Sequence, residues 1–487
     1  MNHDLTRREF FAATTAVGML GSSGGLELSA QVPSEAPAFT VPLARFTAGV
    51  RYEAIPPTAI QNAKNAILDD LGVAVAGATE ESAVMIGRMV REEGAKEEAT
   101  IYGQRFKSSV LQAAFVNGAC AHAQDFDHSF VAGQQPSCAI IPAVFTLGET
   151  LGSSGRQILE AYIAGFEVTA ALMFAVQSLG TGGWHANGTI GTLGAAAACA
   201  RLLGLNETGT DMALAIAASL GSGIIANFGT MTKPLHAGQA TRSGVLAAKL
   251  AKAGFTGNAQ ALEARSGFFD CHYPGGKIDH APIASLGNPW SMEKYGVRYK
   301  PYPCGGLTHS AILAAIRLRN EHQVTPQLID HVEVRVPADT AAPLVYRVPK
   351  AAREGKFSMP YLIARAIIDG NITFDTFTEE AVRNPQALQL LERIDMKVDP
   401  ALQAGTDGSR PAIVAMKLTN GQTQTLEQKF PKGSPEVPMT QDELVSKFRT
   451  CTKGVLSAAS TDRALDYIGK LETMNNIRPL VKTLSGS

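Results

Sequence analysis

The sequence lacks several features that would place it in a common class of protein. It has no basic excess, because 43 Lys and Arg stand against 44 Asp and Glu and the formal net charge is −1. A general nucleic-acid binder carries such an excess, so that class is disfavoured. The balanced charge also means that attraction for an anionic ligand has to come from a few cations gathered in one pocket.

Motifs for cofactors and metals are also missing. No GxGxxG or Walker pattern follows a predicted strand, so a nucleotide cofactor is not indicated. The six cysteines show no CxxC spacing and no paired ligand pattern, which disfavours zinc and iron–sulfur sites. Most of them lie beside Ala or Gly, as small buried thiols do, and we expect them to be free.

After the N-terminal region, we expect no stretch to reach the ~20 apolar residues that a membrane span requires. The N-terminus has the features of an export signal. Arg7 and Arg8 form a twin-arginine pattern, residues 12–20 are weakly apolar, and residues 28–30 offer a small-residue cleavage site. We expect residues 1–30 to be a twin-arginine signal peptide and the mature protein to be soluble, periplasmic and free of the membrane.

Most of the chain has a helical pattern. Its 487 residues, 45% of them apolar, allow two or three well-buried domains. Residues 31–40 are rich in Pro and Ala and are expected to be a linker. From 41 to 292 apolar side chains recur at helical spacing, as between Ile60 and Ala74, and residues 190–203 consist mainly of Ala, Gly and Leu. Because small residues let helices pack closely, we expect a tight helical core.

The pattern changes at about residue 293. Alternating apolar residues predict strands near 332–336, 394–398 and 414–418. The dipeptide Asn420-Gly421 predicts a tight hairpin turn into a further strand, because such turns require positive φ. This part of the chain is therefore expected to contain a small sheet.

Helix returns after Pro431, where residues 440–443 match a capping box. The expected fold is mainly α, with a large all-helical domain and an inserted smaller α+β domain. The expected bounds are 41–292 plus 432–487 for the helical domain and 293–431 for the insertion.

Four short segments place ionisable side chains among small residues, at positions 121–129, 183–189, 231–238 and 299–306. Gly and Ala allow the backbone to approach a ligand closely. Charged groups in apolar surroundings need a partner or a function. We therefore expect the four segments to meet at one site for a small anion.

The acidic and His residues of these segments allow several roles. Asp125 and Asp127 suit a loop after a helix that ends near His122. Such a pair binds a metal, serves as acid and base, or caps a helix within a structural salt bridge. His185 precedes a predicted helix, where it either handles a proton beside an anion or caps a turn of the core.

Lys233 and Lys300 both precede a proline, which predicts an extended backbone at each. A Lys at the start of a helix opposes the helix dipole, so a ligand role for Lys233 is favoured over a packing role. Two lysines on rigid backbone, together with two His and an Asp, predict a clamp for a polycarboxylate.

Together these segments resemble the MmgE/PrpD family, which includes 2-methylcitrate dehydratase, cis-aconitate decarboxylase and iminodisuccinate epimerase. The similarity runs from about Tyr52 to Arg449, and residues 183–188, 231–238 and 300–304 carry most of it. The resemblance implies a homodimer, a large helical domain, a smaller α+β lid domain and a site between them. It implies no metal and no organic cofactor.

The resemblance also implies site residues. Four residues are expected to be catalytic: Asp125, His185, Lys233 and Lys300. Five are expected to bind substrate: Ser129, His128, Gln135, His309 and Tyr302.

One position departs from the family pattern. Gln135 stands where the dehydratase and the decarboxylase carry a His that transfers a proton. A Gln can hydrogen-bond a carboxylate, but it cannot carry a proton near neutral pH. His128 is our candidate for replacing it.

The expected function is a cofactor-independent lyase of the dehydratase type, acting on a small hydroxy-di- or tricarboxylate. A base removes a proton next to a carboxylate while cations stabilise the charge that builds on its oxygens. Decarboxylation or epimerisation of a similar acid are alternatives with the same chemistry. An exported polycarboxylate-binding protein without turnover is an alternative from another class, and it is favoured by Gln135 and the export signal.

Overall fold

The computed structural model describes residues 38–130, 134–179, 182–405 and 407–486. The predicted signal peptide and residues 31–37 of the predicted linker lie outside these ranges. The first described helix, α2, begins at Thr40.

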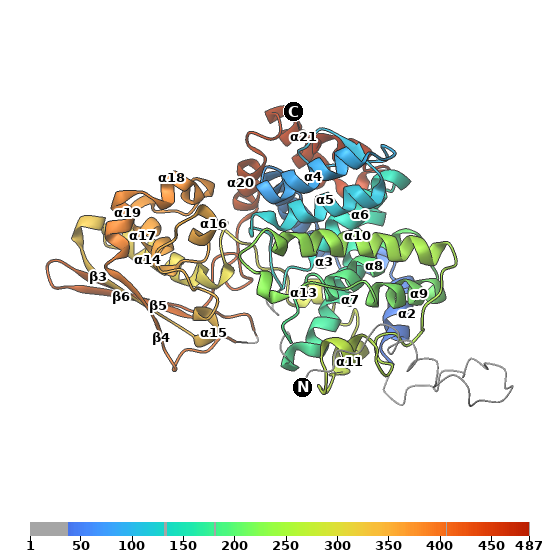
Figure 1. Ribbon diagram of the computed structural model, residues 1–487, viewed down its shortest axis with the longest axis horizontal. Helices are drawn as coiled ribbons and strands as arrows, with labels where there is room; N and C mark the ends of the chain where they lie inside the picture. The colour runs from blue at the N-terminus through green and yellow to red at the C-terminus, as the bar shows by residue number, and fades with distance from the viewer. Residues whose placement is uncertain (1–37, 131–133, 180–181, 406, 487) are drawn as a thin grey trace, which may run out of the picture. The chain divides into compact units, whose positions relative to one another are not determined.

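Helices form nearly all of the regular structure up to residue 294 (Figure 1). The longer ones are α2 (Thr40–Gly49), α3 (Pro57–Gly77), α4 (Glu81–Glu93), α5 (Val110–Ala123), α6 (Ser137–Leu151), α7 (Gly155–Val176), α8 (Ile190–Leu202), α9 (Glu207–Ala218) and α10 (Thr232–Lys252). Three short helices follow, α11 (Phe268–His272), α12 (Ala281–Ala284) and α13 (Ser291–Lys294). A two-stranded ribbon, β1 (Ala99–Thr100) and β2 (Lys107–Ser108), lies between α4 and α5 in the chain.

Small residues let these helices approach closely, as the sequence predicted. A Cβ atom added to Gly244 of α10 would lie 2.4 Å from the Cβ of Ala195 on α8. A Cβ added to Gly238 would lie 2.5 Å from the main-chain oxygen of Phe115 on α5. Helix α10 is therefore held against two neighbours at distances that only glycine permits at these positions.

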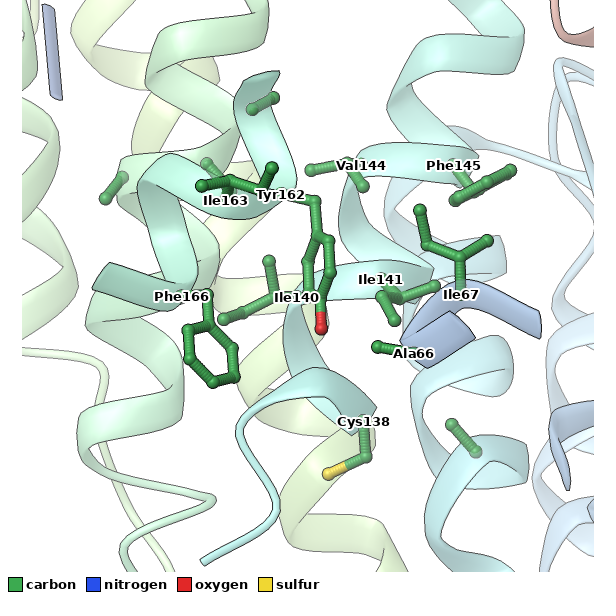
Figure 2. Close-up of a cluster of buried hydrophobic side chains, with 14 of the residues drawn as sticks. Ala66, Ile67, Cys138, Ile140, Ile141, Val144, Phe145, Tyr162, Ile163 and Phe166 are labelled. Atoms are coloured by element: carbon green, nitrogen blue, oxygen red, sulfur yellow. The ribbon is translucent and has the colours of Figure 1, made fainter. Parts of the chain in front are cut away.

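The packing continues around α6 and α7, where the ring of Tyr162 lies among Ile140, Ile141 and Val144 (Figure 2). The Tyr162 hydroxyl is 2.8 Å from the hydroxyl of Ser137, the first residue of α6. Burial raises the pKa of this phenol, so it stays protonated.

Helix α7 corrects one expectation about apolar runs. Together with the 3-10 helix that follows it (Gln177–Leu179), this helix forms a segment, Gly155–Leu179, that is long and apolar enough to cross a membrane by length and composition alone. The protein buries 89% of the apolar window of this helix, which is the position of a core helix. Length and composition alone therefore do not distinguish it from a span, whereas its burial does.

The predicted strands are confirmed. The sheet has the order β4-β3-β5-β6, with bounds β3 (Ile329–Val336), β4 (Ile394–Val398), β5 (Ala412–Leu418) and β6 (Thr423–Gln428). Strand β3 pairs with β4 in parallel and with β5 antiparallel, and β5 and β6 form the expected hairpin. Gly421 in its turn has φ +84°, as the Asn-Gly signal requires.

Helices cover one face of this sheet, and α14, α17 and α19 lie together beside the strands in Figure 1. The helices of this part are α14 (His309–Glu321), α15 (Ala338–Ala341), α16 (Ala352–Gly355), α17 (Met359–Asp369), α18 (Glu379–Val382) and α19 (Pro385–Leu391). On β3, Val332, Val334 and Val336 are fully buried, which matches the alternation in the sequence.

The C-terminal helices are α20 (Gln441–Thr452), α21 (Ala458–Gly469) and α22 (Arg478–Thr483). The predicted capping box is confirmed: the Thr440 N–H donates to Glu443 Oε2 at 2.7 Å, and the Glu443 N–H donates to Thr440 Oγ1 at 3.2 Å. Helix α20 packs on α3, where a Cβ on Gly72 would lie 2.8 Å from the Phe448 ring.

Buried apolar residues form two large clusters. One draws on residues 39–297 and 444–484, and the other on residues 302–418. A mainly α fold with a small sheet is therefore confirmed. The division into domains at 293 and 431, and the arrangement of the smaller one as a lid, remain predictions.

Candidate active site

Seven of the nine predicted site residues line one cavity of about 280 Å³. They are Asp125, Ser129, Gln135, His185, Lys233, Lys300 and His309. This volume lies near the lower limit of ~300 Å³ for small-molecule pockets, which suits a small acid.

Asp125 lies in the predicted loop, two residues after α5 ends. Its φ is +54°, a left-handed backbone that residues other than glycine rarely adopt. The Lys233 Nζ atom donates to Asp125 Oδ1 at 2.7 Å. The Lys300 Nζ atom lies 3.2 Å from the same oxygen and donates to the main-chain oxygen of Asp125 at 2.7 Å. The two lysines, 67 positions apart by number, thus meet at one carboxylate.

Both kinds of charge persist in this cluster at neutral pH. Burial by itself would raise the pKa of Asp125, but Lys233 and Lys300 outweigh burial and hold that pKa well below its usual range. Burial would lower the pKa of Lys300, but Asp125 and Asp127 outweigh it and raise that pKa. Two ammonium groups therefore face one carboxylate, and one positive charge is left for a ligand.

The expected extended backbone at Lys233 is wrong. Helix α10 begins at Thr232, so Lys233 and Pro234 both lie in its first turn. The first N–H groups of a helix have no partner inside the helix, so a proline there removes no hydrogen bond. Lys300 does lie outside helices and strands, two residues after Arg298.

His185 follows a main-chain bridge between Trp184 and Ile224. Its Nδ1 atom is 3.0 Å from Nδ1 of His236, so one of these nitrogens carries the hydrogen and the other accepts it. Burial, together with the charges of His122 and Lys233, lowers the pKa of His185 to about 2. The imidazole is therefore neutral in the protein without a ligand.

His122 was not singled out by the sequence, although it lies in the same segment as Asp125. Its Nδ1 atom is 2.9 Å from Asp127 Oδ2, and its ring stacks on His185 with centroids 5.6 Å apart. With Cys138, this pair brings three possible metal ligands within 4.8 Å of one another. Asp127 Oδ2 is occupied by the hydrogen bond to His122, whereas Oδ1 has no hydrogen-bond partner among the described residues. The charge of Lys300 acts on Asp127 and disfavours a cation at this place.

Gln135 is fixed by Asn187. The Asn187 Nδ2 atom donates to Gln135 Oε1 at 2.9 Å, and the Gln135 main-chain N–H donates to Asn187 Oδ1 at 3.0 Å. Because the amide oxygen of Gln135 accepts from Asn187, the NH₂ group is the side that a ligand carboxylate can meet.

His309 lines the cavity near Lys300. Its Nε2 atom is 3.3 Å from the main-chain oxygen of Cys304. Burial and the charge of Lys300 lower the pKa of His309 to about 3, so this imidazole is neutral as well.

Two predicted residues lie outside the cavity lining. His128 is fully buried, with Nδ1 3.0 Å from Asp69 Oδ2 and Nε2 2.6 Å from the Ser137 hydroxyl. This placement gives no support to a proton-transfer role in place of Gln135. Tyr302 belongs to the second apolar cluster and packs edge-on against the His309 ring, with centroids 5.3 Å apart.

Three further cations line the cavity and were missed: Arg298, Arg410 and Lys432. Arg298 is held beside Ser129 by two main-chain hydrogen bonds of 2.9 and 2.8 Å. None of the three lies in a segment of unusual composition. The one signal that could have found any of them is that Arg298 is two positions from Lys300.

Comparison with known proteins supports the resemblance seen in the sequence. Residues 41–281 match the model of the MmgE/PrpD N-terminal domain, and residues 302–473 match that of the MmgE/PrpD C-terminal domain. Cis-aconitate decarboxylase of Mus musculus is 30% identical over 455 residues, which cover 90% of this chain and 91% of the relative. The Homo sapiens enzyme of the same name is 29% identical over 463 residues, covering 90% and 92%. The one from Aspergillus terreus is 25% identical over 477 residues, covering 92% and 96%. Because the two domain matches span most of the sequence, the chain belongs to the MmgE/PrpD family.

Proposed function

We propose that this chain is a cofactor-independent lyase that removes CO₂ from a small unsaturated polycarboxylate. The observation that carries the proposal is the meeting of Lys233 and Lys300 at Asp125 within a cavity that neutral His185 also lines. The relatives named cis-aconitate decarboxylase, which align over nine-tenths of the chain, favour this reaction among those the family performs.

The reaction needs stabilisation of negative charge. When CO₂ leaves a carbon next to a double bond, the electron pair of the broken C–C bond moves through that double bond. Charge then builds on the carbon beside a second carboxylate and on the oxygens of that carboxylate. Lys233 and Lys300 supply two fixed cations for these oxygens, and both side chains are largely buried, where such charges act strongly.

A proton then has to reach the charged carbon. His185 is neutral in the free protein because burial and the neighbouring cations disfavour its charged form. A bound polycarboxylate brings negative charge that offsets those cations, so ligand binding raises the proton affinity of His185. We assign the delivery of this proton to His185.

Gln135 weighs against both reactions, because the resemblance places a proton-transferring His at this position in the dehydratase and in the decarboxylase, but it weighs more against dehydration. CO₂ leaves as a neutral molecule and needs no proton. A hydroxyl group, in contrast, needs an acid to leave as water, and an amide cannot act as that acid. The dehydration that the sequence first suggested therefore has one requirement more, and we place it second.

Three further statements belong to the proposal and rest on the sequence and the resemblance alone. They are a homodimer, an α+β lid over the site, and export to the periplasm by the twin-arginine route. Mass from light scattering tests the first, a structure with bound ligand tests the second, and fractionation of the host with Arg7→Lys and Arg8→Lys together tests the third.

Proton NMR in D₂O separates the possible activities. The panel contains cis-aconitate carrying ¹³C in its carboxyl groups, citrate and aspartate-like acids. We expect new vinyl signals from cis-aconitate, with labelled CO₂ released in equal amount and one deuterium in the product. Vinyl signals from a hydroxy acid without CO₂ would replace the proposal by dehydration. Deuterium exchange without net product would replace it by epimerisation, and thermal stabilisation without any exchange would leave a binding protein.

A further inference from the structure

We propose that Arg298 and Arg410 form a carboxylate subsite in the same cavity, distinct from the lysines at Asp125, that selects ligands with a third carboxylate. This inference rests on the proposed function for the reaction, but the subsite itself is a statement about binding. Neither arginine was singled out by the sequence, and neither is needed to stabilise charge at the lysines.

The guanidinium of Arg298 is buried and only partly compensated. Its side chain is 9% exposed, and NH1 lies 3.3 Å from Glu436 Oε2. NH2 donates to the main-chain oxygen of Asp407, whereas Nε has no hydrogen-bond partner among the described residues. Gly408, with φ +80°, packs against this group, since a Cβ there would lie 2.4 Å from Nε. The loop is thus shaped to hold a buried cation beside the cavity.

Arg410 brings a second guanidinium to this place. Its NH1 atom donates to the main-chain oxygen of Ser409 at 3.0 Å, and no ion pair joins Arg410 to a carboxylate within the described part of the chain. Burial lowers the pKa of Arg298, the carboxylates of Glu436 and Asp407 oppose this effect, and the charge of Arg410 adds to it. Glu436 and Asp407 compensate Arg298, whereas Arg410 has no such partner among the described residues, so a further anion beside the two guanidinium groups is favoured.

The charge of the whole cavity supports the same conclusion. Five Lys or Arg residues line it, against one carboxylate, that of Asp125. Two more carboxylates, Glu436 and Glu443, pair with Arg298 and Lys432. Asp407 also acts on Arg298, and Lys429 in turn acts on Asp407. The positive charge without a carboxylate partner among the described residues therefore lies at Arg410 and at the two lysines that share Asp125.

These features indicate that the ligand carries at least two separate carboxylates. The lysines engage the carboxylate beside the reacting carbon, and Arg298 with Arg410 engage a carboxylate at a separate part of the wall. Arginine suits this task, because its planar fork binds a carboxylate through two parallel hydrogen bonds. The cavity thus fits a tricarboxylate better than a dicarboxylate of the same backbone.

Isothermal titration calorimetry with tricarballylate and glutarate tests the subsite, because these unreactive acids share a propane backbone and differ by one carboxylate. We expect wild type to bind tricarballylate more tightly. Arg410→Gln should weaken tricarballylate about tenfold or more and change glutarate little. Glu436→Gln, which frees Arg298 from its counterion, should strengthen tricarballylate. Arg317→Gln, an exposed position on α14, is the matched control and should leave both affinities unchanged.

Two results would overturn the subsite: equal affinities of wild type for the two acids, or a loss in Arg410→Gln that is the same for both. A thermal melt of each variant shows whether it is folded, and Glu436→Gln tests the subsite in the opposite direction if Arg410→Gln does not fold. Failure of the proposed lyase would look different, since no acid of the NMR panel would react while the preference for tricarballylate persisted.

Discussion

Replacing Lys233 by Met separates the charge of this side chain from its packing. Met keeps a similar length and an unbranched apolar stem, and it removes only the ammonium group that lies 2.7 Å from Asp125. Asp125 keeps its second partner, because Lys300 contacts both its carboxylate and its main-chain oxygen. The carboxylate is therefore not left unpaired, and we expect Lys233→Met to fold.

The expected loss of activity follows from the role of the charge. A fixed donor at the place where negative charge develops contributes about 2.7–4 kcal/mol to the transition state, so kcat should fall about 10²- to 10³-fold. The cost in stability should be smaller, about 1–3 kcal/mol, because one charged hydrogen bond is lost while the rest of the cluster remains. Activity should thus fall far more than folding.

The assay is the initial rate of vinyl product by NMR, together with the free energy of unfolding from urea titration. Lys249→Met is the matched control, because Lys249 lies on the same helix α10 and is exposed. Loss of a charge-stabilising donor should leave about a hundredth of wild-type kcat or less. If Lys233→Met kept more than about a tenth, Lys233 would have no place in the mechanism. An equal loss in Lys249→Met would trace the effect to the helix instead.

Three more predictions concern proton transfer and pH. Gln135→His should raise turnover of cis-aconitate or citrate by NMR, and no gain would mean that this position does not limit the reaction. When tricarballylate binds near pH 6, the protein should take up as much as about one proton, because the ligand raises the lowered pKa of His185. Calorimetry in buffers of different ionisation enthalpy measures this uptake, which should vanish in His185→Gln. His309 has a pKa of about 3 in the fold, so the unfolded chain binds the extra proton below pH ~6.5 and stability falls as pH falls. Between pH 7 and 5 the free energy of unfolding should fall by about 2 kcal/mol through His309. Urea titration should show that this fall is lost in His309→Gln and kept in His331→Gln, which changes an exposed position.

Local chemistry explains why much of the fold was predictable. The capping box at Thr440 and the hairpin at Gly421 depend on residues within three or four positions of one another, and the structure contains both. The strands were readable because one face of each is buried, which imposes alternation on the sequence. The meeting of Lys233 with Lys300 was predicted from composition, because both lysines lie in segments that place charges among small residues.

Tertiary context explains what was not predictable. His128 looked like a ligand-binding residue, but its partner Asp69 lies 59 positions away, and nothing near His128 in sequence reveals that pairing. Arg410 lies in an ordinary polar loop, and only the fold brings it beside Arg298. At Lys233 the local rule for a residue before proline gave the wrong backbone, because the start of a helix tolerates proline.

In the proposed mechanism, the cluster at Asp125 would link ligand binding to proton delivery without a change of shape. Asp125 lets two ammonium groups be buried side by side, and the positive charge that remains helps to keep His185 neutral. A polycarboxylate neutralises that remaining charge when it binds. In the proposed mechanism the same event would secure the ligand and raise the proton affinity of the imidazole, so that His185 would become an acid only when there is a substrate to protonate.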